Sequence, residues 1–168
     1  MTQQDTPAPH RPQLPSGWRR FALRLPIRLF RAGLGPLFGS RFLLLHHTGR
    51  VTGADHHAVL EVVAHDPACG SWTVASGFGP QADWYRNLRR LPQTVIQVGN
   101  RHHAVTARFL PPEDGSEVMA HYAAARPRTA RRLCAFTGLT ADGSTASFHE
   151  AGRAIPFVRL DAAGHHLP

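Results

Sequence analysis

The sequence contains no lysine, so all 19 of its basic side chains are arginines. Each arginine carries a guanidinium fork that stays charged and suits carboxylates and phosphates. Against 11 acidic residues the formal net charge is +8. Up to residue 41 there are seven arginines and one acid, giving +6, and the remaining chain has 12 arginines against ten acids, giving +2. Because the basic excess is N-terminal, a nucleic-acid-binding surface spread over the body of the protein is disfavoured.

Cysteine is also scarce. Cys69 and Cys134 are far apart and stand in no CxxC or metal-ligand spacing, which argues against a disulfide framework and favours the cytoplasm as a reducing compartment. Long apolar runs are absent too, and none approaches the roughly 20 residues that a membrane-spanning helix needs. With 168 residues, 42% of them hydrophobic, the chain is long enough for one domain with a sizeable core.

The N-terminal region has two parts with different composition. Residues 1–15 are rich in Pro, Gln and Thr and are expected to be a disordered tail without secretory-signal character. Residues 16–40 form a basic amphipathic segment, with a helix expected over 16–32 and a kink or restart at Pro26. This helix can pack on its own domain or lie on an anionic membrane surface, and the first arrangement is the commoner one.

Residues 41–168 are expected to form one domain of mostly β structure with flanking helices. Alternating apolar residues predict strands over 41–47, 56–65, 71–76, 94–98, 103–109 and 154–162. Helices are predicted over 82–91, from 112 and over 128–137. Strands and helices do not alternate regularly, and Pro156 is typical of an edge strand. The fold class expected is therefore α+β, a small antiparallel barrel with helices outside it.

The motif TGRVTG, residues 48–53, predicts a tight turn between two strands from which Arg50 projects. Its glycines allow backbone N–H groups to approach an anion, and the guanidinium adds a bidentate donor. The same pattern also fits a plain hairpin connection with a solvated arginine, which is the commoner case.

A second motif, ASGFGPQADWYRNL at residues 75–88, predicts a strand, a glycine loop and a helix that begins near Asp83. The free N–H groups at that helix start could bind an anion together with the Ser76 hydroxyl. Trp84 and Asn87 lie about one turn apart and could offer a ring and an amide to a flat polar heterocycle. The alternative is a surface helix whose tryptophan packs in the core.

The 12 histidines include four adjacent pairs, at 46/47, 56/57, 102/103 and 165/166. Neighbours on a strand point to opposite faces, so no such pair can chelate one metal, and no metal site is predicted. His56 or His57 could instead supplement Arg50 at an anion. No nucleophilic triad motif is present, which indicates that a cofactor would carry any chemistry.

Taken together, these segments resemble the deazaflavin-dependent nitroreductase family, also described as F-420-dependent quinone reductases. The resemblance is carried, in this order, by LLLHHTGRVTG, VLEVV, VASGFGPQADWYRNLRR and TVIQVGNR, and it spans about residues 41–137. It implies a split β-barrel of the FMN-binding, pyridoxamine-phosphate-oxidase-like type. It also implies reduced coenzyme F-420, an 8-hydroxy-5-deazaflavin, as a hydride donor.

The resemblance implies three groups of cofactor-binding positions. The phosphate and tail side would be lined by Arg50, Val51, Thr52, His56, His57, Ala58, Val59, Leu60 and Glu61. The phosphate and ring would be met by Val74, Ala75, Ser76 and Gly77, and the deazaflavin would be covered by Asp83, Trp84, Tyr85, Arg86 and Asn87. Tyr85 is in addition the expected proton donor or hydrogen-bond partner in catalysis.

Three positions depart from what is common in the family. A basic residue often follows TGR, where this chain has Val51. Another basic residue is common near the next strand, where this chain has His56. A lysine sometimes follows the serine of SxG, where this chain has Gly77. Each charged hydrogen bond lost from a phosphate grip is worth on the order of 1.5–3 kcal/mol. Arg86, Arg89 and the N-terminal arginines are the remaining charges that could compensate.

The leading hypothesis is an F-420-dependent oxidoreductase that transfers hydride to a quinone, a nitroaromatic or a similar electron-poor acceptor. One alternative keeps the fold but binds FMN, or carries F-420 without turnover. Another is a membrane-surface adaptor. The expected partners are a small-molecule acceptor and, through residues 16–35, the inner face of the membrane. The protein is expected to be a monomer or a homodimer.

Overall fold

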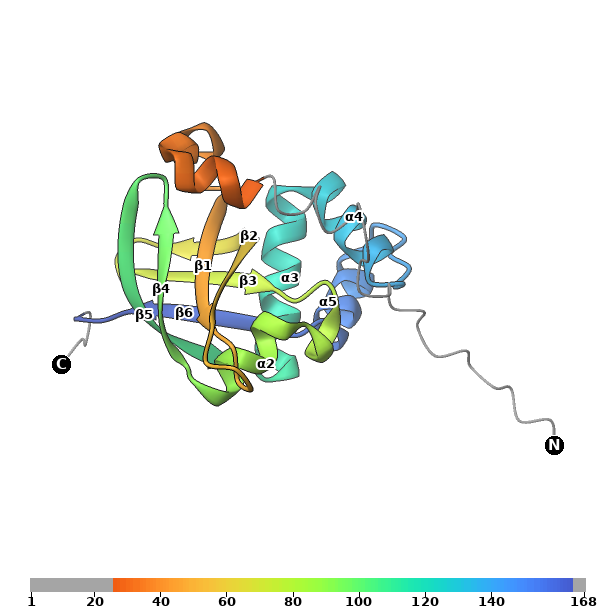
Figure 1. Ribbon diagram of the computed structural model, residues 1–168. Helices are drawn as coiled ribbons and strands as arrows, with labels where there is room; N and C mark the ends of the chain where they lie inside the picture. The colour runs from red at the N-terminus through yellow and green to blue at the C-terminus, as the bar shows by residue number, and fades with distance from the viewer. Residues whose placement is uncertain (1–25, 165–168) are drawn as a thin grey trace.

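The computed structural model describes residues 26–164. The predicted tail over 1–15 and most of the predicted helix over 16–32 therefore lie outside the described residues. Within the described part, six strands form one closed antiparallel barrel in the order β1-β2-β3-β6-β5-β4 (Figure 1). The strands are β1 Phe42–Thr48, β2 Asp55–Asp66, β3 Ser71–Ala75, β4 Gln93–Val98, β5 Arg101–Phe109 and β6 Phe157–Ala162. This confirms the expected barrel and each predicted strand region.

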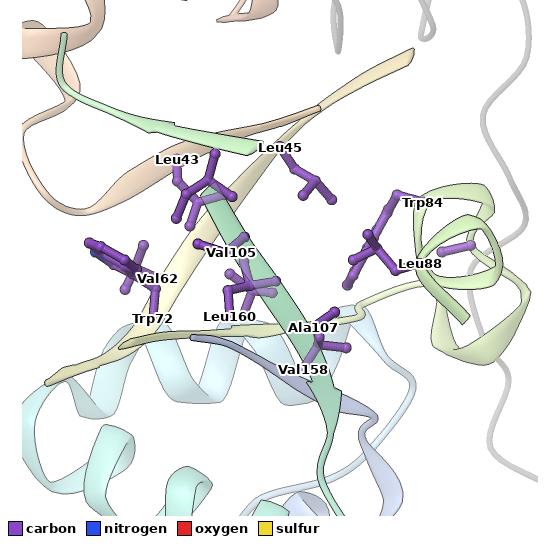
Figure 2. Close-up of a cluster of buried hydrophobic side chains, with 13 residues drawn as sticks. Leu43, Leu45, Val62, Trp72, Trp84, Leu88, Val105, Ala107, Val158 and Leu160 are labelled. Atoms are coloured by element: carbon purple, nitrogen blue, oxygen red, sulfur yellow. The ribbon is translucent and has the colours of Figure 1, made fainter. Parts of the chain in front are cut away.

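The interior of the barrel is filled by alternate side chains of the strands, as the period of two predicts. Leu43 and Leu45 of β1 are fully buried there, and the short helix α2, Asp83–Arg90, adds Trp84 and Leu88. Figure 2 shows these two side chains reaching from α2 toward the strand side chains, with Trp72 on the far side of the cluster. Helix α2 therefore closes one end of the barrel, and this places its first turn beside the β1–β2 loop.

A second core lies between the barrel and three helices, α3 Pro112–Ala125, α4 Pro127–Phe136 and α5 Thr145–Ala154, which gather on one side of the barrel (Figure 1). Met119, Phe148 and Phe157 are almost fully buried in it. Helices α3 and α5 approach closely where Gly115 faces Gly152: a Cβ built on Gly152 would lie 2.5 Å from the Gly115 carbonyl oxygen. The absence of both side chains is what allows this approach.

The C-terminal region differs from the prediction in two ways. Helix α5 was not predicted, although Ser144 caps it by accepting a hydrogen bond from the Ser147 N–H (3.2 Å). The last strand begins at Phe157, and the prediction that Pro156 marks an edge is wrong. Strand β6 pairs with β3 on one side and β5 on the other, and the proline is tolerated because it precedes the ladder.

The described end of the N-terminal segment packs on the barrel. Residues 26–29 are helical and continue as η1 Phe30–Leu34, which a positive φ at Gly33 interrupts, and η2 Gly35–Phe38. Phe30 is 1% exposed, and its ring stacks on Phe38 with centroids 4.9 Å apart. This part of the chain therefore packs on its own domain, the first of the two arrangements expected for the segment. None of the helices within 26–164 combines the length and apolar character needed to cross a membrane.

Candidate functional site

A recess of about 240 Å³ lies where the β1–β2 loop meets the first turns of α2. It is lined by Gly49, Arg50, Val51, Thr52, His56, Asp83 and Asn87. Both sequence motifs, TGRVTG and ADWYRNL, contribute to it. The structure therefore brings together two motifs that are far apart in the sequence.

The β1–β2 loop is held by its own backbone. The Gly49 N–H donates to the Ala54 carbonyl (2.7 Å), and the Gly53 N–H donates to the Gly49 carbonyl (2.8 Å). Gly53 has φ 70°, a conformation that glycine adopts without strain. The Thr52 hydroxyl accepts from the Ala54 N–H (3.3 Å). The tight turn predicted for this motif is present, and it directs the Arg50 side chain toward α2.

Arg50 connects the loop to α2 by three hydrogen bonds. Its backbone N–H donates to Asn87 Oδ1 (3.1 Å), and its Nη1 donates to Asn87 Oδ1 (2.9 Å) and to Asp83 Oδ1 (3.2 Å). The Arg50 side chain is 25% exposed, whereas that of Asp83 is 72% exposed. Arg50 is thus fixed from the protein side and open on the solvent side.

The Asn87 amide links Arg50 to His47. Arg50 can only donate, so the oxygen of the Asn87 amide must face it and the NH₂ group must face His47. Asn87 Nδ2 accordingly donates to His47 Nδ1 (2.9 Å). A nitrogen that accepts carries no proton, so His47 is neutral with its proton on Nε2. Burial and the neighbouring His56 lower the pKa of His47 to about 4, which agrees with that state.

The loop before α2 uses its polar groups internally. The Ser76 hydroxyl donates to the Gly79 carbonyl (2.6 Å), and the Gly79 N–H donates to the Ser76 carbonyl (2.9 Å). Ala82 occupies the N-cap of α2 and offers no capping side chain. The first turn of α2 therefore has no side-chain cap, and uncapped helix N-termini favour an anion.

Several predicted cofactor positions instead lie in the hydrophobic cores. Val74 is 0% and Trp84 8% exposed. Ala58 and Leu60 pack against the barrel interior, and Ala75 packs against the helix-side core. Two interpretations were open for Trp84, a ring that contacts a heterocycle and a side chain packed in the core. Its place in the barrel core matches the second. These residues can shape a site only by supporting the backbone around it.

Others lie on different surfaces from the recess. His57 and Val59 are half-buried on β2, where they alternate with the core-facing positions, and Glu61 accepts from the Tyr122 hydroxyl (2.9 Å) and from Arg41 (3.2 Å). Arg86 is exposed on α2. Gly77 lies under Phe136, whose ring would be 2.8 Å from a Cβ at that position.

Tyr85, in the first turn of α2, is half-buried and held by aromatic contacts. Its ring meets Phe109 edge-on at 5.0 Å between centroids and Trp84 at 5.8 Å. The role predicted for its hydroxyl stays a prediction.

The histidines pair across strands rather than along them. His46 Nδ1 lies 3.1 Å from His57 Nε2 on the outer face of β1 and β2, whereas the rings of His47 and His56 stack at 5.6 Å. Sequence neighbours therefore do diverge to opposite faces, as the strand geometry requires. Across residues 26–164, no group of three or more metal-ligating side chains is placed to hold an ion.

Two residues near the candidate site were not singled out from the sequence. His47 shares the inward positions of β1 with Leu43 and Leu45, so the alternation could have placed it inside the barrel end. Phe136, the last residue of α4, meets Phe78 edge-on at 5.2 Å and covers Gly77. No local pattern could have brought α4 to this loop, because the contact depends on how the helices pack.

Comparison with known proteins identifies the family. The model of the F420H(2)-dependent quinone reductase family matches residues 27–135. A solved F420-H2 dependent reductase has 20% identity and a TM-score of 0.50, over 72% of this chain and 94% of its own. A conserved hypothetical protein from Mycobacterium tuberculosis has 18% identity and a TM-score of 0.51, over 82% of this chain and 88% of its own.

A further solved structure, described as a domain-swapped dimer, has 18% identity and a TM-score of 0.52, over 86% of this chain and 100% of its own. At these identities the structures show the fold alone. The comparison with curated proteins found no match. The family model covers well over half of the sequence and includes both motifs that meet at the recess. The chain therefore belongs to the F420H(2)-dependent quinone reductase family.

Proposed function

We propose that this protein is a reductase that uses reduced coenzyme F420 to reduce a quinone, a nitroaromatic or a similar electron-poor acceptor. The observation that carries the proposal is the meeting of Arg50 with the uncapped first turn of α2 in one recess. The family match covers that recess. Family membership supports F420 as the cofactor. The class of acceptor is part of the proposal, and the acceptor screen below tests it.

The residues of the recess fit the anionic part of such a cofactor. Arg50 offers a guanidinium that is open to solvent on one side, and α2 offers its first-turn N–H groups. A volume of about 240 Å³ suits a phosphate and its adjoining groups rather than a whole cofactor. The ring would have to extend beyond the recess, along the surface that begins at α2.

When bound, reduced F420 supplies a hydride from its deazaflavin ring. The chain's own contribution is to bind and orient. Asn87 holds Arg50 through two hydrogen bonds, so the guanidinium is already directed when an anion arrives. Tyr85, fixed by its aromatic neighbours, is proposed to donate a hydrogen bond or a proton to the acceptor.

The alternative cofactor is FMN, or F420 held without turnover. The observation that favours it is the small number of basic side chains in the two motifs. Arg50 is followed by Val51, which is 87% exposed and lines the recess, and Ser76 is followed by Gly77, which lies outside the recess under Phe136. A single guanidinium provides a weaker phosphate grip than a cluster of them.

The test is a fluorescence titration of the full chain with oxidised F420 and, in parallel, with FMN, followed by a screen of quinone and nitro acceptors with reduced F420. We expect F420 to bind and FMN to bind weakly. Arg50→Gln should weaken F420 binding by about tenfold or more, because a charge-assisted hydrogen bond is worth roughly 1.5–3 kcal/mol. Arg153→Gln, on the exposed side of α5, is the matched control and should bind like wild type.

Preferential binding of FMN would move the protein to a flavin-dependent function. F420 binding without turnover of any acceptor would support the carrier alternative. We also propose that the N-terminal segment makes peripheral contact with a membrane, where a quinone acceptor would be found, and that the protein acts as a monomer or a homodimer.

A further inference from the structure

The recess has almost no net fixed charge, although it is proposed to bind an anion. Among its seven lining residues, Arg50 is cationic and Asp83 is anionic, and the others are neutral apart from the imidazole of His56. The Asp83 carboxylate lies 3.2 Å from Arg50 Nη1. A phosphate that enters this recess therefore meets a guanidinium that already has a carboxylate partner.

The two partners of the Arg50 guanidinium differ in how firmly they hold it. Asn87 is 3% exposed and is itself fixed by His47. Asp83 is on the outer side of the helix, with a side chain 72% exposed, and within residues 26–164 its carboxylate forms an ion pair with Arg50 alone. Ion pairs this exposed are worth about 0.2–1 kcal/mol. The Asp83 contact is therefore the one that an incoming anion can replace.

We propose that Asp83 is an internal competitor for the Arg50 guanidinium, and that a phosphate or carboxylate group of the ligand displaces it. The Asn87 hydrogen bonds keep Arg50 in place during this exchange, so the exchange moves the exposed carboxylate and leaves the loop unchanged. This inference deepens the proposed function, since it names the residue that sets the affinity of that site for anions. Asp83 acts by lowering affinity, and it disfavours small anions that offer no contact beyond Arg50.

Asp83 also has a structural role that the test must separate. It is an acidic residue in the first turn of α2, where it stabilises the helix dipole by about 0.3–1 kcal/mol. Glu113 is likewise an acidic residue in the first turn of a helix, α3, and it is not among the residues that line the recess. Glu113→Gln is therefore a matched control that removes a first-turn charge without touching Arg50.

The experiment measures binding of oxidised F420 and of inorganic phosphate to wild type, Asp83→Asn and Glu113→Gln at low ionic strength. Asp83→Asn should bind both anions roughly two- to fivefold more tightly, the range that corresponds to an exposed ion pair. Glu113→Gln should match wild type. In an Arg50→Gln background the Asp83→Asn gain should shrink, because the competition acts through the guanidinium. Asp83→Ser, a good first-turn residue without charge, replaces Asp83→Asn if the latter unfolds.

The outcomes separate this inference from the proposed function. F420 binding by wild type that Asp83→Asn leaves unchanged or weakens would overturn the competitor role and leave the proposed function intact. Failure of every variant to bind F420 would overturn the proposed function. In that case the phosphate titration tests the competitor role. Tighter phosphate binding by Asp83→Asn than by wild type would support the role, and equal affinities would overturn it.

Discussion

At the scale of single residues, the Asn87 amide couples the surface arginine to a buried histidine. Its orientation is dictated by Arg50, which can only donate, and it leaves His47 Nδ1 as an acceptor. His47 is 7% exposed, so its neutral state is part of how the barrel end is stabilised.

This state predicts a loss of stability in mild acid. The pKa of His47 is lowered from 6.5 to about 4, chiefly by burial and then by His56 and His57, while Asp83 opposes the shift. As the pH falls from about 6.5 toward 4, the unfolded chain takes up a proton that the folded chain does not. The free energy of unfolding should therefore fall by on the order of 3 kcal/mol over that window on account of His47, and be unaffected by it above pH 6.5.

The control for this prediction is His47→Asn, whose amide oxygen can still accept from Asn87. Urea unfolding at several pH values should show a smaller acid loss in the variant than in wild type. His46, His57 and His103 also have lowered pKa values, but they are present in both proteins and cancel in the difference. Parallel pH dependences for the two proteins would contradict the assignment.

Residue types in a motif predicted the site only in part. Arg50 and Asn87 belong to motifs that are far apart in the sequence, and only the fold shows that they meet. Trp84 illustrates the limit, because a tryptophan one turn from an amide fits a ring-binding surface and a core position equally well. Trp84 takes the core position because α2 covers one end of the barrel, where a large apolar side chain fills the interior. That requirement is set by the whole fold and is not visible in the local sequence.

At the scale of elements, strands were predicted well because a strand with one buried face alternates along the sequence. Helix α5 was missed for an equally local reason. Gly152 interrupts its apolar face, and glycine disfavours helices by about 1 kcal/mol relative to alanine. The structure shows why glycine is there: helix α3 passes so close that any side chain would collide.

Gly152→Ala should consequently destabilise the protein despite alanine's better helix propensity. The added methyl would lie 2.6 Å from Met119 Cβ and 2.7 Å from Ser116 Cα, and overpacking of this kind costs about 1–3 kcal/mol. Chemical denaturation should show a lower unfolding midpoint. Arg153→Ala, one residue along on the exposed face of the same helix, should stay within about 0.5 kcal/mol of wild type. A Gly152→Ala midpoint at or above that of wild type would show that the helices can separate without cost.

At the scale of the whole molecule, two features depended on long-range pairing. The barrel closes because β1 pairs with β4 as well as with β2, and nothing in either strand alone specifies that partner. The same closure gives β6 two neighbours, which is why a proline next to it did not mark an edge. The uneven charge, in contrast, was fully readable from the sequence, because it depends only on where the arginines are.

That charge distribution underlies the proposal of membrane contact. The segment that carries much of the basic excess ends in η1 and η2, which are anchored on the barrel by buried Phe30 and present Leu37 at 77% and Leu34 at 40% exposure. Exposed leucines beside arginines are typical of segments that lie on an anionic bilayer surface. We expect the full chain to sediment with vesicles of phosphatidylglycerol and phosphatidylcholine, and less with phosphatidylcholine alone or at high salt.

Replacing an exposed leucine tests whether apolar contact contributes to vesicle binding. Leu37→Gln should weaken vesicle binding by about fivefold, the effect of withdrawing roughly 1 kcal/mol of apolar burial. Leu91→Gln removes another exposed leucine, 45% exposed at the end of α2, and should bind vesicles like wild type. Equal loss in both variants would indicate nonspecific adsorption. Binding that depends on salt but not on Leu37 would indicate that the arginines alone attract the protein to the vesicle surface.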